Sequence, residues 1–87
     1  MTQNDIVRVC TGISIMLQEK NAAYGDSALD PVRIFSKANA VEQLLVRIDD
    51  KLSRFARGTA YPGDNDIDDL IGYLVLLKIA KERHGQA

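Results

Sequence analysis

Apolar residues recur at intervals of three and four along two long stretches of this chain, the spacing of α-helices that each bury one face, and a third long stretch is almost continuously apolar. Turn-forming residues separate the stretches, and the two prolines, Pro31 and Pro62, lie in these separators. No stretch alternates apolar and polar residues as a half-buried strand does. The pattern therefore predicts an all-α fold, a small helical bundle of two or three long helices plus a short one, in one domain over residues 1–87.

The residues around the first separator predict where the first two helices begin and end. The first helix should span roughly residues 4–22, with Gly25 in the left-handed position that often follows a helix end. Asp30 followed by Pro31 is typical of a helix start, with the aspartate as cap and the proline in the first turn. We therefore expect a short helix from Val32 to about Ala38.

Two further start signals define the remaining long helices. Asn39 and Glu42 have the spacing of a capping box, which opens a helix that should end at Gly58. After a turn cluster over residues 59–63, Asp64 is the expected cap of the last helix, which should persist to about Arg83.

The last helix is apolar around its whole circumference, and such a helix is usually buried on all sides. Two long helices and one short helix give it thin cover, so we expect self-association, in which last helices pack on each other or on neighbouring helices. Gly72 costs about 1 kcal/mol relative to alanine inside a helix. Close approach of a backbone or ligand would explain it, and so would simple tolerance. The apolar residues are Ile67, Leu70, Ile71, Leu74, Val75, Leu76, Leu77, Ile79 and Ala80.

Charge and cysteine content limit the classes of function. Eleven basic and twelve acidic residues give a net charge of −1, so no global field attracts nucleic acid, and Asp50 interrupts the local basic stripe. A single cysteine, Cys10, with no leader-like segment before it, favours a reducing cytoplasm. The apolar run over residues 70–77 is too short to span a bilayer. One histidine and one cysteine make no zinc site, and no glycine-rich phosphate loop is present.

Carboxylates concentrate at the start of the last helix, beyond what capping requires. Asp66, Asp69 and Tyr73 should share one helix face. On the preceding helix Asp49 lies between apolar neighbours, where a carboxylate needs a cation, and Asp50 follows it. One hypothesis is a Mg²⁺ ion held by Asp49, Asp50, Asp66 and Asp69, with Lys51 and Arg54 on a ligand's phosphates. The alternative is an inter-helix salt-bridge network with no ligand.

Three spaced motifs carry a resemblance to a known family. They are Lys20-Asn21-x-x-Tyr24-Gly25-Asp26, Arg47-x-Asp49-Asp50-Lys51-x-x-Arg54, and Asp64-x-x-x-x-Asp69-Leu70-x-x-Tyr73. Together they resemble the small phage all-α family of nucleotide-modification-associated domains, over roughly residues 18–80. The resemblance implies a phage origin, a host-cytoplasmic location and nucleotide chemistry. It implies a nucleotide-binding set made of Lys20, Asn21, Tyr24, Arg47, Lys51, Arg54 and Tyr73.

A more distant resemblance is to the all-α nucleoside triphosphate pyrophosphohydrolases of the MazG type. Asp66-x-x-Asp69 is similar to the second half of their metal motif, with aspartate in place of glutamate. Their first half, Glu-x-x-Glu on the preceding helix, has no counterpart here. The first hypothesis is therefore an oligomeric protein that binds and sequesters a phosphorylated or cyclic nucleotide. The alternatives are a Mg²⁺-dependent pyrophosphohydrolase, in which a metal-bound water attacks phosphorus, and a structural helical module.

Overall fold

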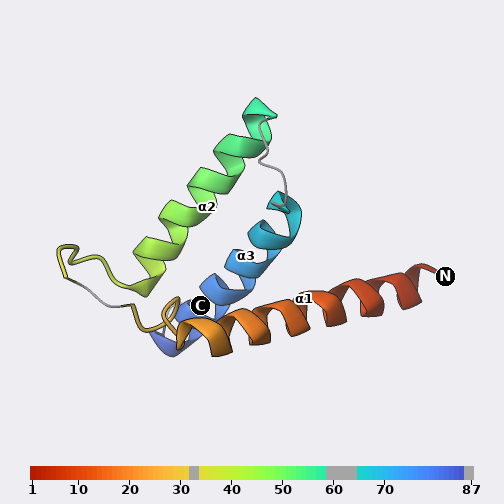
Figure 1. Ribbon diagram of the computed structural model, residues 1–87, viewed down its shortest axis with the longest axis horizontal. Coiled ribbons are helices and arrows are strands. Elements are labelled where there is room, and N and C mark those ends of the chain that lie inside the picture. Colours follow the sequence, from red (N-terminus) through yellow and green to blue (C-terminus); the bar gives the residue numbers. More distant parts are fainter. Residues whose placement is uncertain (32–33, 59–64, 86–87) are drawn as a thin grey trace.

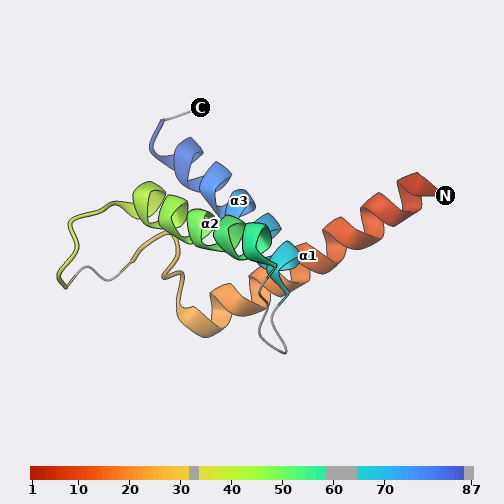
Figure 2. The same cartoon turned by 90° about the horizontal axis from the view of Figure 1, so that it is seen from above.

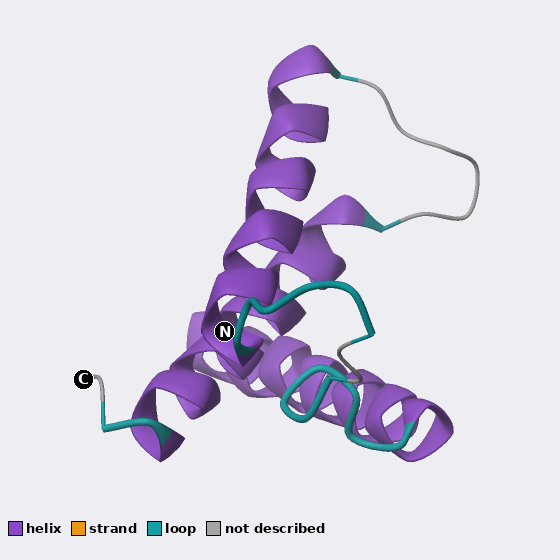
Figure 3. Ribbon diagram, turned by 90° about the vertical axis from the view of Figure 1, so that its left-hand side faces the viewer, coloured by secondary structure: helices purple, strands orange, loops and turns teal. Residues whose placement is uncertain are grey.

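The computed structural model describes residues 1–31, 34–58 and 65–85, which form three helices and no strand. The helices are α1 (Thr2–Tyr24), α2 (Ala40–Arg57) and α3 (Asp66–Arg83). The described residues outside the helices are loops and turns (Figure 3). The all-α prediction and the three long helices are thereby confirmed, while assembly with further copies stays a prediction.

The core lies between α2 and α3, which run antiparallel and make the most extensive helix contact in the described chain (Figure 1). Val41 and Leu44 of α2 and Ala80 of α3 are buried together. Partly buried side chains from α3 and from the segment after α1 complete the cluster, namely Ala28, Leu29, Tyr73, Leu76 and Leu77. The two C-terminal helices thus form the packed part of the molecule.

Helix α1 crosses α3 and contacts it over a short length (Figure 1). Figures 1 and 2 show its N-terminal half extending away from the other helices in both views. Ile13 is the only buried residue of α1. At the crossing, a Cβ added at Gly72 would lie 2.9 Å from Leu17 Cδ2. Close helix approach therefore explains Gly72, with side chains of α1 as the neighbour.

The predicted capping signals are largely confirmed. Gly25 and Gly58 both have positive φ, at 62° and 65°, in the left-handed conformation that glycine adopts without strain. The Asn39 side chain accepts a hydrogen bond from the Glu42 backbone N–H at 2.9 Å. At α3 the expected cap was one residue off: Asn65 accepts from the Asp68 N–H, and Asp64 lies outside the described residues.

The short helix predicted from Val32 to Ala38 is wrong over its described part, since residues 34–38 are bends and irregular backbone. Ile34 is exposed and Phe35 is 97% exposed, so an apolar face here has nothing to pack against. Short helices depend on such packing because nucleation is costly. The Ser36 hydroxyl instead accepts a hydrogen bond from the Ala38 N–H, a local turn that precedes the Asn39 cap.

The buried face of α2 is rotated relative to the face expected from sequence. Its buried residues are Ala40, Val41, Leu44, Ile48 and Lys51. Asp49, predicted to lie against the apolar interior, is exposed, and this prediction was wrong. The error came from Leu45 and Leu52, which flank Asp49 on the helix surface but are themselves exposed. The charged residue on the buried side is Lys51.

No helix in the described part of the chain is both long enough and apolar enough to cross a membrane.

Candidate functional site

An ion-pair cluster joins α2 to the first turn of α3. Lys51 is buried, with 7% of its surface exposed. Its ammonium lies 3.2 Å from Asp66 Oδ1 and 3.0 Å from Asp69 Oδ2. Arg54 lies 3.9 Å from Asp66 Oδ1 and 3.5 Å from Asp50 Oδ2. From α1, Lys20 donates to Asp69 Oδ1 at 3.2 Å. The cluster therefore ties all three helices to two aspartates.

The cluster raises the pKa of Lys51 and lowers the pKa of Asp69. Burial lowers the pKa of the Lys51 ammonium, but hydrogen bonds to Asp69 and Asp66 outweigh it, and the pKa lies above its ordinary value. Burial raises the pKa of Asp69, but hydrogen bonds from Lys51 and Lys20 outweigh it, and the pKa lies below its ordinary value. Both groups are therefore charged across the neutral pH range.

The predicted metal residues do not gather into one group. Asp66 and Asp69 share Lys51, whereas Asp50 pairs with Arg54 and Asp49 is exposed. Over residues 1–31, 34–58 and 65–85, no three His, Cys, Asp or Glu side chains are arranged to hold a metal ion. The positive charge between Asp66 and Asp69 is the ammonium of Lys51, which corresponds to the salt-bridge alternative. Mg²⁺ binding itself stays a prediction.

A cavity of about 380 Å³ opens beside this cluster, between all three helices, and is called the three-helix cavity below. Its walls follow one face of each helix, with residues spaced three, four or seven apart. Helix α1 supplies Met16, Leu17, Lys20, Asn21 and Tyr24; the next turn supplies Ser27 and Ala28; α2 supplies Gln43, Leu44 and Arg47; and α3 supplies Asp69, Gly72, Tyr73 and Leu76. A volume of this size is within the range of small-ligand sites.

Five of the seven residues in the predicted nucleotide-binding set line this cavity: Lys20, Asn21, Tyr24, Arg47 and Tyr73. The other two, Lys51 and Arg54, lie in the ion-pair cluster instead. Asp69 belongs to both, because it lines the cavity and binds Lys20 and Lys51.

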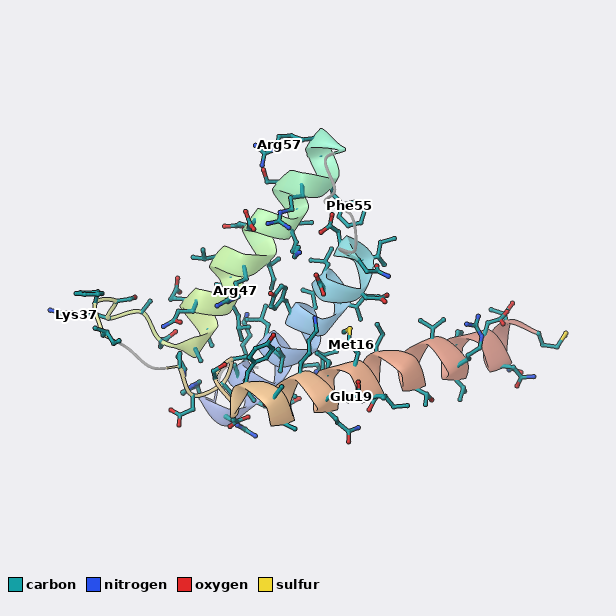
Figure 4. The ribbon with its side chains drawn as sticks, viewed as in Figure 1. Met16, Glu19, Lys37, Arg47, Phe55 and Arg57 are labelled. Atoms are coloured by element: carbon teal, nitrogen blue, oxygen red, sulfur yellow. The ribbon has the colours of Figure 1, made fainter. Side chains whose placement is uncertain are left out.

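Arg47 and Tyr24 line the cavity with exposed side chains. Arg47 is exposed, and no described residue forms a hydrogen bond or ion pair with its guanidinium. Tyr24 is 70% exposed. Figure 4 labels Arg47 on α2 and Met16 on α1, with Met16 extending from α1 on the side that faces α3. The cavity thus combines a cation that has no partner among the described residues, an accessible aromatic ring and an apolar floor.

Sequence reasoning did not identify several residues of the cavity wall as site residues. Met16 precedes Lys20 by four residues, Gln43 precedes Arg47 by four, and Leu76 follows Tyr73 by three. Each therefore lies one helical turn from a residue that was identified, and the helical repeat was the signal that would have found it. Gln43 is already engaged, since its amide donates to the Ala38 carbonyl at 2.9 Å.

Comparison with known proteins gives no significant match, whether to family models, to curated proteins or to solved structures. The two resemblances noted in the motifs stay predictions.

Proposed function

We propose that this protein binds a phosphorylated or cyclic nucleotide in the three-helix cavity and sequesters it. The observation that carries the proposal is the presence of Arg47, a cation with no partner among the described residues, in the same cavity as Tyr24. A phosphate and an aromatic base are the two parts of a nucleotide that such groups recognise.

The phosphate end of the ligand would bind between α1 and α2. Arg47 offers a planar fork that matches two phosphate oxygens, and Lys20 offers an ammonium from the opposite helix. Asp69 lines the same space, but Lys20 and Lys51 already bind its two oxygens. Its negative charge is therefore compensated, and Arg47 supplies positive charge that no described group neutralises.

The base end would lie toward Tyr24, whose exposed ring is free to stack. Asn21 and Ser27 line the cavity nearby and carry both donors and acceptors for a base edge or sugar hydroxyl. Leu44 and Leu76 provide an apolar floor against which a ring or ribose packs.

Sequestration is favoured over hydrolysis by the ion-pair cluster. In the pyrophosphohydrolase alternative, Asp66 and Asp69 hold Mg²⁺, but here they are bound by Lys51, Lys20 and Arg54. Mg²⁺ would have to displace a buried ammonium whose two hydrogen bonds raise its pKa. The Glu-x-x-Glu half of the metal motif is also missing from the sequence.

The test is calorimetric titration with a panel of nucleoside mono- and triphosphates and cyclic nucleotides, with and without Mg²⁺. Arg47→Ala should weaken binding of the best ligand at least tenfold, since a charge-assisted bidentate contact is worth about 1.5–3 kcal/mol. Arg57→Ala is the matched control, because Arg57 lies at the far end of α2 and does not line the cavity (Figure 4). It should bind as the unmodified protein does.

Chromatography of the ligand after incubation separates binding from chemistry. Recovery of unchanged nucleotide supports sequestration. Release of pyrophosphate that needs Mg²⁺ and is abolished by Asp69→Asn would establish the pyrophosphohydrolase alternative instead. No heat with any member of the panel would contradict nucleotide binding and leave the structural helical module.

A further inference from the structure

A second hollow lies on the other side of the α1–α3 crossing and is mostly apolar. It is a groove of about 480 Å³, called the α1–α3 groove below. Helix α1 contributes Val9, Ile13 and Leu17, and helix α3 contributes Val75, Leu76 and Ile79. Charged residues among its lining are confined to Asp26 and Arg83. The proposed nucleotide site uses neither the apolar walls near Val9 nor those near Val75.

The apolar stripe of α1 continues past the groove into the N-terminal half that extends from the molecule. Ile6 is 57% exposed and Val9 is 45% exposed, although both lie on the stripe that buries Ile13. Figures 1 and 2 show this half of α1 without a neighbouring helix in either view. A helix with an apolar stripe gains its stability in water mainly by packing that stripe.

The single chain exposes much more surface than a compact monomer of its mass. Its accessible area is 6684 Å², whereas a folded monomer of 9.6 kDa is expected to expose about 5,100 Å². Its radius of gyration is 14.2 Å, against about 12 Å for a compact domain of this length. The excess area is about 1,600 Å² per chain, which is what each partner of a large homodimer interface buries.

We propose that the occupant of the α1–α3 groove is a second copy of this chain. In a two-fold pairing, the extended half of each α1 packs into the groove of the other copy, so that two α1 and two α3 helices form one bundle. The stripe and the groove are complementary in chemistry, since the exposed stripe of α1 and the groove walls on α1 and α3 are both apolar. The arrangement also covers the exposed side of α3 at Val75.

The experiment is light scattering of the full chain at micromolar and at several-hundred-micromolar concentration. The unmodified protein should have twice the chain mass, and Val9→Asp should have the mass of one chain. Val46→Asp is the matched control: Val46 is an exposed valine on α2 that lines neither hollow, so this variant should keep the double mass. Arg47→Ala should keep it as well, which separates this proposal from nucleotide binding.

The single thiol gives a second readout that needs no folding of a variant. Cys10 lines the groove and is exposed in the isolated chain. Its reaction with a thiol reagent should slow severalfold as the unmodified protein is concentrated through the dimerisation range. A monomeric mass at the highest concentration, a reaction rate independent of concentration, or a Val9→Asp protein that stays helical and dimeric would overturn the proposal. Protection by a detergent or by another protein at a monomeric mass would assign the groove to those occupants.

Discussion

Lys51 is the residue whose environment differs most from what its type suggests. It occupies a core position on α2, and its ammonium is held between Asp66 and Asp69. A buried ion pair adds little compared with a well-packed apolar pair, but removing one partner leaves the other charges uncompensated. The stability of the α2–α3 contact therefore depends on the whole cluster being present.

Lys51→Met should lower the free energy of unfolding by about 3 kcal/mol, since it removes the cation and leaves two partly buried carboxylates with only their weaker partners. Urea unfolding followed by circular dichroism at neutral pH measures the change. Lys78→Met is the matched control: its side chain is 80% exposed and its pair with Glu82 is on the surface, so the effect should stay below about 0.5 kcal/mol. A loss as small as that of the control would show that the cluster contributes no stability.

The same cluster predicts that the stability of the protein decreases at both acidic and strongly basic pH. Because folding lowers the pKa of Asp69 below its ordinary 3.8, the contribution of Asp69 is present above that pH and lost as the pH falls through the lower, folded value. Because folding raises the pKa of Lys51 above its ordinary 10.5, the contribution of Lys51 is present below that pH and lost as the pH rises through the higher, folded value. The contribution of the cluster should therefore be constant across neutral pH.

Urea midpoints across pH test this dependence. The unmodified protein should lose more stability below pH 4 than Lys51→Met does, since the variant has already lost one of the two hydrogen bonds that lower the pKa of Asp69. An equal loss of stability below pH 4 in the two proteins would contradict the role of Lys51 in lowering the pKa of Asp69.

At the level of single residues, sequence reasoning found the participants and mistook their environments. Asp66, Asp69 and Lys51 were all identified as charged residues of interest, and the salt-bridge alternative was recognised. Lys51 is buried and Asp49 is exposed because of how α2 is rotated about its own axis against α3. Apolar periodicity does not fix that rotation when Leu45 and Leu52 extend the stripe on one side.

Among the elements, helices whose ends carry a capping signal were predicted to within about two residues. Asn39, Gly25 and Gly58 act through local hydrogen bonds and backbone conformation, which the sequence determines directly. The short helix failed because its start signal was local but its persistence required a packing partner, and Phe35 has none. Local signals therefore located helix ends, while tertiary contact decided which helices exist.

The crossing of α1 over α3 can be tested with two glycines inside helices. Gly12→Ala on α1 should stabilise the protein by about 1 kcal/mol, since an added Cβ has nothing within 4 Å and alanine favours the helix. Gly72→Ala gains the same propensity but places its Cβ 2.9 Å from Leu17 Cδ2 and 3.4 Å from Met16 Cε, so those side chains must move. Its net gain should be clearly smaller. Equal gains in urea midpoints would mean that α1 does not approach α3 this closely.

For the whole molecule, the three-helix cavity predicts that ligand binding and global stability are linked. All three helices line it, so a ligand bound there holds α1 against the α2–α3 pair. At a concentration one hundred times its Kd, a nucleotide should raise the free energy of unfolding by about 2.7 kcal/mol. In a domain of this size that corresponds to a rise of about 10–20 °C in Tm.

Thermal melts followed by circular dichroism measure this rise, with Arg57→Ala as control and Arg47→Ala as test. The control should show the full rise and the test variant should lose most of it at the same ligand concentration. An equal rise in both would place the ligand away from Arg47.

At the scale of the whole molecule, the sequence indicated which residues share a helix face better than it indicated how the three helices are arranged. Lys20, Asn21 and Tyr24 share a face of one helix, which periodicity shows without a structure. Arg47 and Tyr73 line the same cavity, whereas Lys51 and Arg54 do not. This difference depends on how the three helices pack together, which the sequence does not show. The extended N-terminal half of α1 was not predicted either, because its apolar stripe predicts burial but does not identify the helix that it packs against.

Leu17 and Leu76 line both the three-helix cavity and the α1–α3 groove, so a single layer of side chains separates the two hollows. Any repacking of this layer by a molecule on one side changes the surface offered on the other, since close-packed interiors transmit displacement. Thermodynamic reciprocity then applies: if a nucleotide tightens the pairing of two copies, the pairing tightens the grip on the nucleotide by the same factor. If both proposals hold, a higher concentration of this protein increases ligand capture by more than the increase in the number of sites alone.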